Sequence, residues 1–69
     1  MNYVVVYEKS HTGWSAYVPV LPGVVTTGPT KEEAKQLIRE AIEFHLEGLR
    51  EDNLPIPEPA ASAEVVSVS

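Results

Sequence analysis

The chain has 69 residues, with five Lys and Arg against ten Asp and Glu and no cysteine, which gives a formal net charge of −5. An acidic chain lacks the clustered cations that release counterions from a phosphate backbone, so we expect no direct binding to nucleic acid. The absence of cysteine excludes disulfides and thiolate metal sites. No secretory signal pattern opens the chain and no apolar run reaches the ~20 residues of a membrane span, so we expect a cytoplasmic protein without membrane contact.

The length predicts one domain, residues 1–69, with a small hydrophobic core. Near this size a single core is only marginally sufficient, and oligomerisation is a common remedy. We therefore expect a homodimer or a higher oligomer. An acidic chain also suits a basic protein partner, because complementary potentials speed encounter and disfavour wrong partners.

The first predicted strand covers residues 2–9, which are rich in Val and Tyr. Its apolar side chains fall on both faces, which indicates a strand central to the sheet or one covered by a partner on its second side. A polar loop ending in Gly13 then suits a hairpin. The second strand, antiparallel to the first, is predicted over 14–18, and Pro19 ends it because proline lacks an amide donor.

A tight turn and a third strand follow. Leu21-Pro22-Gly23 places Pro where a type II turn fixes φ and Gly where that turn requires a positive φ. The third strand is predicted over residues 24–27, directly after the turn.

Residues 31–50 form the predicted helix around which the chain is organised. Thr30 and Glu33 have the spacing of a capping box, and Pro29 stops any earlier helix from running in. Apolar residues then recur at the i, i+3, i+4, i+7 spacing of one helix face. They are Ala34, Leu37, Ile38, Ala41, Ile42, His45, Leu46 and Leu49. One helix cannot bury this stripe alone, so it needs a sheet.

The chain after the helix is predicted to be a linker and a last strand. Three prolines over residues 54–59 forbid a helix and favour a semi-extended linker that carries the chain back across the domain. Residues 64–68 have the composition of a short terminal strand at a sheet edge, the element best placed to pair with another subunit. The predicted fold is α+β with the order β-β-β-α-β, a mainly antiparallel sheet covered on one face by one helix.

Two motifs in the middle of the chain resemble those of the HicB-like antitoxin family. Residues 17–23, YVPVLPG, are similar to the family pattern Y-x-P-x-L-P-G, and residues 28–34, GPTKEEA, to the pattern G-x-T-x-x-E-A. The likeness extends through residues 41–49 to the proline-rich tail, and so covers nearly the whole chain. Val20 and Val24 depart from the family, in which an acidic residue and a Cys are common at these positions.

The resemblance implies a homo-oligomeric antitoxin with a degraded ribonuclease-H-like core. Such antitoxins bind and occlude a small basic HicA-type toxin, a ribonuclease that cuts messenger RNA. The chain has no room for the C-terminal DNA-binding domain of longer members, so the resemblance implies a short form without autoregulation at an operator.

A metal-dependent nuclease needs several carboxylates that converge on Mg²⁺. Glu8 and Glu64 on predicted strands and Glu58 in the linker do not form such a set. His11 and His45 are isolated, with no second ligand at a metal-binding spacing. We therefore expect no catalytic residues, no metal and no cofactor.

The residues predicted to bind the toxin are three acidic helix positions and one aromatic residue. The acidic residues are Glu40, Glu43 and Glu47. Trp14, just beyond a loop at the start of a strand, is either the largest core side chain or an aromatic anchor for a partner.

The predicted oligomer interface has two parts. A ridge at i+4 spacing is basic in its first half and acidic in its second, so an antiparallel two-fold pairing would set Arg39 against Glu43 of the partner subunit. The other interpretation of this ridge is a solvated charged surface. The second part is the terminal strand, with Val65, Val66 and Val68.

The favoured hypothesis from the sequence is a non-catalytic antitoxin that neutralises a basic toxin by covering it. The alternative is an orphan homo-oligomer on the same scaffold, with a structural role or a small ligand bound between subunits. Residual metal-dependent nuclease activity is a third hypothesis, which Glu8→Gln would test.

Overall fold

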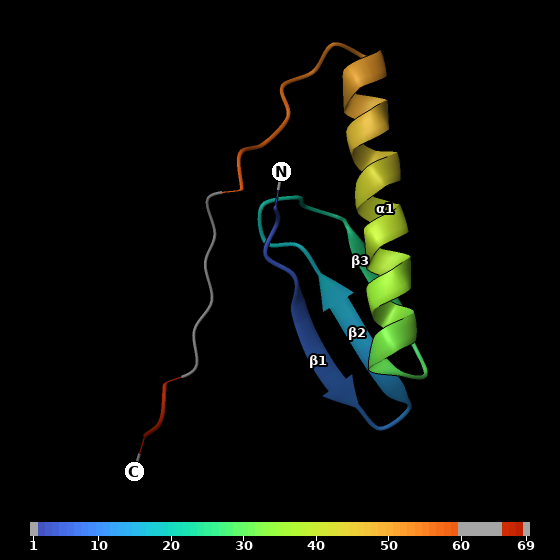
Figure 1. Ribbon diagram of the computed structural model, residues 1–69, viewed down its shortest axis with the longest axis vertical. Coiled ribbons are helices and arrows are strands. Elements are labelled where there is room, and N and C mark those ends of the chain that lie inside the picture. Colours follow the sequence, from blue (N-terminus) through green and yellow to red (C-terminus); the bar gives the residue numbers. More distant parts are fainter. Residues whose placement is uncertain (1, 60–65, 69) are drawn as a thin grey trace.

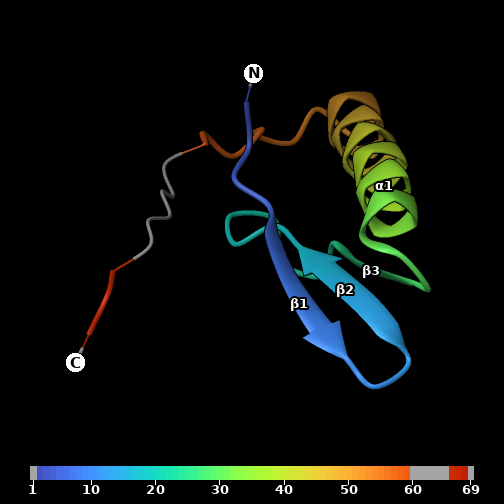
Figure 2. The same ribbon diagram turned by 60° about the horizontal axis from the view of Figure 1, so that its bottom comes forward.

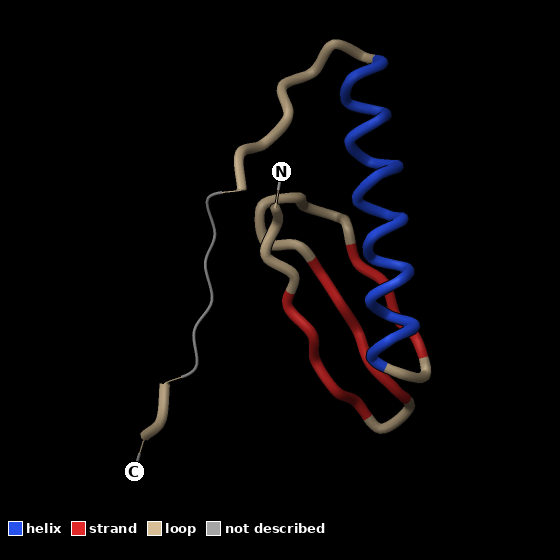
Figure 3. The backbone as a smooth tube through the Cα atoms, viewed as in Figure 1, coloured by secondary structure: helices blue, strands red, loops and turns tan. Residues whose placement is uncertain are grey.

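The computed structural model describes residues 2–59 and 66–68, in which a small sheet is followed by one long helix (Figure 1). The strands are β1 (Val6–Ser10), β2 (Gly13–Tyr17) and β3 (Val25–Gly28), and the helix is α1 (Lys31–Glu51). The sheet is antiparallel throughout, in the order β1-β2-β3. Figure 3 shows the strands in red beside the helix in blue. This architecture confirms the predicted α+β class.

Strand β1 is shorter than predicted and lies at an edge of the sheet. The strand was predicted over residues 2–9, but its pairing starts where Val6 lies opposite Tyr17. Two steps further back the same register reaches Pro19, which has no amide to donate. The amide of Val18 turns instead to the carbonyl of Val24, at 3.3 Å. Because β2 is the central strand, the interpretation of residues 2–9 as a central strand is wrong.

The loop between β2 and β3 closes one end of the core. The amide of Val24 donates to the carbonyl of Leu21 at 3.1 Å, and Gly23 has φ +84°, as the predicted type II turn requires. A preceding turn is closed by the bond from the Leu21 amide to the Val18 carbonyl, at 3.0 Å. The two turns bury the Leu21 side chain completely.

The start of α1 confirms the predicted cap. Thr30 has the extended conformation of an N-cap, and its hydroxyl accepts a hydrogen bond from the Glu33 amide at 3.1 Å. The Thr30 carbonyl accepts the first helical bond, from the Ala34 amide at 3.0 Å. These local bonds explain why the helix begins at Lys31, where the sequence places it.

The end of α1 has a motif that the sequence interpretation missed. The amide of Leu54 donates to the Leu49 carbonyl at 2.8 Å, and the amide of Asn53 donates to the Arg50 carbonyl at 3.1 Å. Asn53 has φ +55°, so this pair of bonds is a Schellman motif with Asn in the left-handed position. The motif ends the helix one residue beyond the predicted boundary.

The hydrophobic core lies between α1 and the face of the sheet formed by β2 and β3. Its buried members are Ala16, Val18, Leu21, Val24, Ala34, Ile38 and Leu46. The Thr26 hydroxyl donates to the Ala34 carbonyl at 3.3 Å, which joins β3 to the first turns of the helix. In Figures 1 and 2, β3 lies next to α1 and β1 lies farthest from it. The helix therefore covers one half of the sheet more closely than the other.

The predicted apolar stripe of the helix is largely confirmed. Ala34, Ile38 and Leu46 are buried, and Ala41, Ile42, His45 and Leu49 are partly buried. The prediction is wrong for Leu37, whose side chain is 41% exposed. Ile38 lies at the centre of the buried face, and Leu37 points about 100° away from it round the helix axis. Leu37 therefore falls at the edge of that face.

The proline-rich segment returns to the residues that precede β1. The Tyr3 hydroxyl donates to the Pro57 carbonyl at 2.7 Å, and Ile56 packs against the core. Of the predicted terminal strand, residues 64 and 65, including the interface candidate Val65, lie outside the described residues. Val66 and Val68 are 70% and 90% exposed and belong to no strand of the described chain, so pairing with another subunit stays a prediction.

Two glycines, Gly13 in the sheet and Gly48 in the helix, should respond to an added methyl group with opposite changes in stability. A Cβ added at Gly13 would lie 2.3 Å from the Gly28 carbonyl oxygen, so Gly13→Ala should lower the free energy of unfolding by about 1–3 kcal/mol. A Cβ at the helical Gly48 meets nothing within 4 Å, so Gly48→Ala should raise it by about 0.5–1 kcal/mol. Urea unfolding of both variants measures the two signs, and a neutral Gly13→Ala contradicts the close contact.

Candidate partner-binding surfaces

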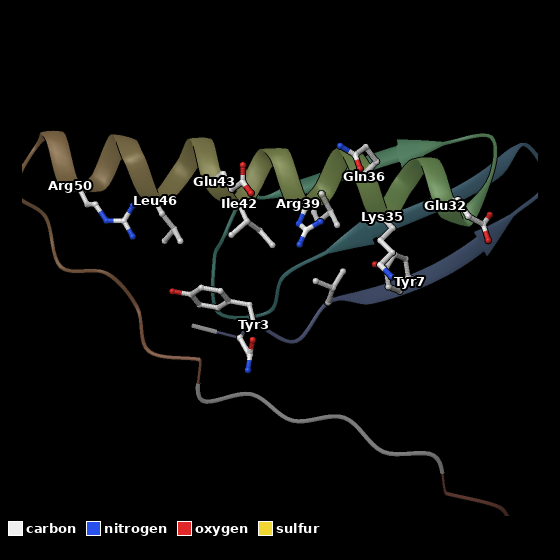
Figure 4. Close-up of a pocket in the computed structure, with 13 residues that line it drawn as sticks. Tyr3, Tyr7, Glu32, Lys35, Gln36, Arg39, Ile42, Glu43, Leu46 and Arg50 are labelled. Atoms are coloured by element: carbon white, nitrogen blue, oxygen red, sulfur yellow. The ribbon is translucent and has the colours of Figure 1, made fainter.

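An open groove runs between α1 and the segment of residues 2–7. Its volume is about 610 Å³, and its floor is apolar, with Tyr3, Val5, Ile38, Ile42 and Leu46 among the lining residues. In Figure 4 the side chains of Ile42 and Leu46 extend from the helix toward Tyr3. The groove exists because the helix packs closely on β2 and β3 but not on β1.

Charged side chains of α1 form the rim of this groove. Three of them, Lys35, Arg39 and Arg50, belong to the five Lys and Arg of the whole chain, and Glu32 and Glu43 complete the rim. In a protein with a net charge of −5, this flank of the helix is locally cationic.

The flank of α1 away from the groove has the opposite charge. Glu33, Leu37, Glu40, Phe44, Glu47 and Glu51 fall within a sector of roughly 80° on a helix with 100° per residue, and we call these six residues the acidic strip. No Lys or Arg of α1 lies in this sector. The two apolar members are exposed, Leu37 by 41% and Phe44 by 79%. The strip thus combines carboxylates with uncovered apolar surface.

Two of the three predicted partner-binding glutamates lie in the acidic strip, and the third lies at its border with the groove, about 40° round the helix from Glu47. Glu40 and Glu47 belong to the acidic strip, and the Glu40 carboxylate accepts a hydrogen bond from the side-chain Nε2 of Gln36 at 3.3 Å. Glu43 lines the groove together with Arg39, the residue one turn before it. The predicted i+4 ridge contained Glu43 and Glu47 but not Glu40, and on a 3.6-residue helix such a ridge drifts about 40° per step round the axis.

Trp14 lies apart from all three glutamates. Its side chain is partly buried against the core, and the Lys31 ammonium lies 5.7 Å from its ring centroid and 5.1 Å from that of Tyr7. These distances are within the range of cation–π contacts. Lys31 is the first residue of the helix, so Glu43 lies about 18 Å further along the helix axis, at 1.5 Å per residue. Trp14 therefore joins the helix N-terminus to the hairpin and is not adjacent to the acidic residues.

The functional candidates that the sequence interpretation missed are Leu37 and Phe44. Their spacing of seven residues is that of neighbours on one helix face, and glutamates surround them in the sequence. Leu37 was assigned to the buried stripe, and Phe44 was assigned no role. An apolar pair that repeats out of phase with the stripe was the available signal.

The open face of the sheet is also partly apolar. The register sets Val6, Tyr17 and Val25 side by side across the three strands, on the face opposite Ala16 and the helix. Tyr17 is 39% exposed and Val25 is 59% exposed. The sequence left a second interpretation of residues 2–9, a strand that a partner covers on its second side. Such a partner would bury this trio.

Within residues 2–59 and 66–68 no group of three or more His, Asp or Glu side chains is placed to hold a metal ion. His11 is exposed in the hairpin loop, and Glu8 is exposed on β1. In the same part of the chain, no helix is long and apolar enough to cross a bilayer.

A small antiparallel sheet under one helix defines the class as an α+β protein. The charges of the helix are separated between its two flanks, which gives surfaces suited to binding another macromolecule. The particular family follows from comparison with known proteins. The family model of the HicB-like antitoxins of bacterial toxin–antitoxin systems matches residues 3–68, and the chain belongs to this family.

Several relatives extend this result. The UPF0150 protein Ta0767 of Thermoplasma acidophilum is 41% identical over 69 residues, which cover 99% of this chain and 97% of the relative. Antitoxin HicB 2 of Photorhabdus laumondii is 34% identical over 64 residues, 93% of this chain but 46% of the relative. An uncharacterised 14.9 kDa protein of Haemophilus phage HP1 is 40% identical over 57 residues, 83% of this chain and 43% of the relative. The chain thus spans less than half of the two longer relatives, and no solved structure matches it significantly.

Two aromatic substitutions separate a structural role from a surface role. Trp14 packs against the core, so Trp14→Ala should lower the free energy of unfolding by about 2 kcal/mol or more. Phe44 is 79% exposed, so Phe44→Ala should change it by less than about 0.5 kcal/mol. Thermal or urea unfolding checks both values. An unaffected Trp14→Ala would instead support the predicted role of Trp14 as a partner anchor.

Proposed function

We propose that the protein is the antitoxin of a toxin–antitoxin pair, and that it neutralises a small basic HicA-type toxin that cleaves messenger RNA in the cytoplasm. The observation that carries the proposal is the match of residues 3–68 to the HicB-like antitoxin family, which includes a relative named Antitoxin HicB 2. The charge of the chain supports it, because an acidic protein is complementary to a basic ribonuclease.

The proposed mechanism is occlusion without catalysis. The antitoxin covers the surface with which the toxin binds RNA, and it competes electrostatically with the phosphate backbone. The proposed contacts are Glu40, Glu43 and Glu47, with Trp14 as the predicted anchor. The exposure of the three glutamates supports the first part, and the partial burial of Trp14 beside Lys31 makes it the least accessible member of the set.

The test is a titration of the protein into a HicA-type toxin, with the rate of RNA cleavage as the readout. Stoichiometric loss of cleavage is expected. The combined variant Glu40→Gln, Glu43→Gln, Glu47→Gln should bind more weakly and lose less affinity as salt is raised, because it presents three fewer charges. Unchanged affinity removes these residues from the contact surface, and failure of the unaltered protein to slow cleavage rejects the proposal.

We further propose that the protein forms a homo-oligomer through an antiparallel pairing of α1 with its copy. Arg39 of one subunit would face Glu43 of its partner in a self-complementary contact. Both side chains line the exposed rim of the groove, which supports their availability. The predicted terminal strand, with Val65, Val66 and Val68, would be a second interface.

A charge reversal tests the helix pairing. Arg39→Glu should lower the oligomer mass measured by light scattering at low salt, because it sets two like charges against each other. The double variant Arg39→Glu, Glu43→Arg restores complementarity and should recover the mass. If the mass of Arg39→Glu equals that of the unaltered protein, the helix pairing is rejected and the ridge is a solvated surface.

The groove favours a second candidate function, that of an orphan scaffold with a small bound ligand. Its volume of about 610 Å³ is within the range of small-molecule sites. Its floor is apolar, and three cations lie on its rim. A small anionic aromatic compound has the matching chemistry. A fluorescent anionic naphthalene dye is a suitable probe. Binding of this dye that Lys35→Gln weakens and Glu8→Gln leaves unchanged would support this candidate.

A further inference from the structure

The acidic strip has a feature that the electrostatic proposal does not use, a large aromatic side chain in solvent. Phe44 is 79% exposed although it belongs to a well-formed helix, and Leu37, seven residues earlier on the same flank, is 41% exposed. Neither side chain belongs to the core or to the residues packed against it. Aromatic residues of this kind supply most of the energy of many protein interfaces.

We propose that the acidic strip is the surface on which the basic toxin docks, with Phe44 as the anchor of the contact. This inference rests on the proposed function and deepens it, because it names the side of the helix that meets the toxin. The strip spans Glu33 to Glu51, about 27 Å along the axis at 1.5 Å per residue, which is enough for one face of a small protein.

The separation of charge on α1 selects this flank over the other. The strip contains four carboxylates and no cation, whereas the groove rim carries three cations, Lys35, Arg39 and Arg50, against the two carboxylates of Glu32 and Glu43. A basic partner that approached the groove would meet a rim with a net positive charge, which is less favourable for association. On the opposite flank the same partner meets only opposite charges, with Phe44 and Leu37 along one edge of the carboxylates.

The expected partner surface follows from this arrangement. It has an apolar recess that accepts the Phe44 ring and Lys or Arg side chains that reach the carboxylates on either side. Helices that dock in this way present anchors at i, i+4 and i+7 spacing, and Leu37 and Phe44 have the last of these spacings. The anchor supplies affinity, and the surrounding glutamates supply the speed and register of association.

The two contributions differ kinetically, which makes the inference testable. The probe is a HicA-type toxin made inactive by replacement of its catalytic His, and its binding is followed by stopped-flow or surface-based kinetics at several salt concentrations. Phe44→Ala should weaken binding about 10-fold or more through faster dissociation, with the salt dependence unchanged. Glu40→Gln and Glu47→Gln should instead slow association and flatten the salt dependence.

Matched controls lie on the open face of the sheet. Val25→Ala removes apolar atoms from a side chain that is 59% exposed, and Glu8→Gln removes one exposed carboxylate from β1. Both should bind the inactive toxin within about twofold of the unaltered protein. Circular dichroism of Phe44→Ala confirms that the helix is retained.

The outcomes separate this inference from the proposed function. If the unaltered protein binds the toxin and Phe44→Ala binds it equally well, or if Val25→Ala weakens binding as much, the docking surface is wrong and the antitoxin function stands. If the unaltered protein does not bind the toxin, the proposed function fails, and the docking inference fails with it. A loss confined to the strip variants supports both.

Discussion

The close approach of α1 to β2 and β3 determines the rest of the structure. Ala16 and Ala34 are fully buried in this contact, and a Cβ at Gly28 would lie only 3.0 Å from the Ala34 amide nitrogen. The Thr26 hydroxyl adds a hydrogen bond to the Ala34 carbonyl. Larger side chains here would hold the helix away from the sheet, because packed interiors have no room for added methylenes. Small residues thus place the helix over one half of the sheet.

This off-centre position gives one helix two chemically different surfaces. Toward β1 the helix stands clear of the sheet, and the space between them is the groove with its cationic rim. On the other flank Phe44 and the surrounding glutamates face solvent. A helix centred on the sheet would bury both flanks equally and leave only its outer face for binding. The packing of α1 on the sheet therefore decides which of its charged side chains border the groove and which face solvent on the other flank.

The sequence predicted those features that local interactions decide, and it failed where distant residues decide. The cap at Thr30 and the positive φ of Gly23 follow from neighbouring residues, so both were predictable. The start of β1 depends on Pro19, which lies in the turn after β2, and residues 2–9 alone cannot reveal this dependence. At the candidate site, acidic residues were recognised by charge, but which of them border the groove and which lie beside exposed apolar residues depends on how the helix lies on the sheet. Phe44 was missed for that reason.

The acidic strip also runs against the stability of its own helix. Glu32 and Glu33 in the first turn and Arg50 in the last turn complement the helix dipole, whereas Glu51, the last residue of the helix, opposes it. Glu47 lies one turn before Glu51, and like charges at this spacing destabilise a helix by about 0.2–0.5 kcal/mol. In a domain with so small a core, such a cost is appreciable. Carboxylates that weaken the free helix are best explained if a basic partner neutralises them on binding.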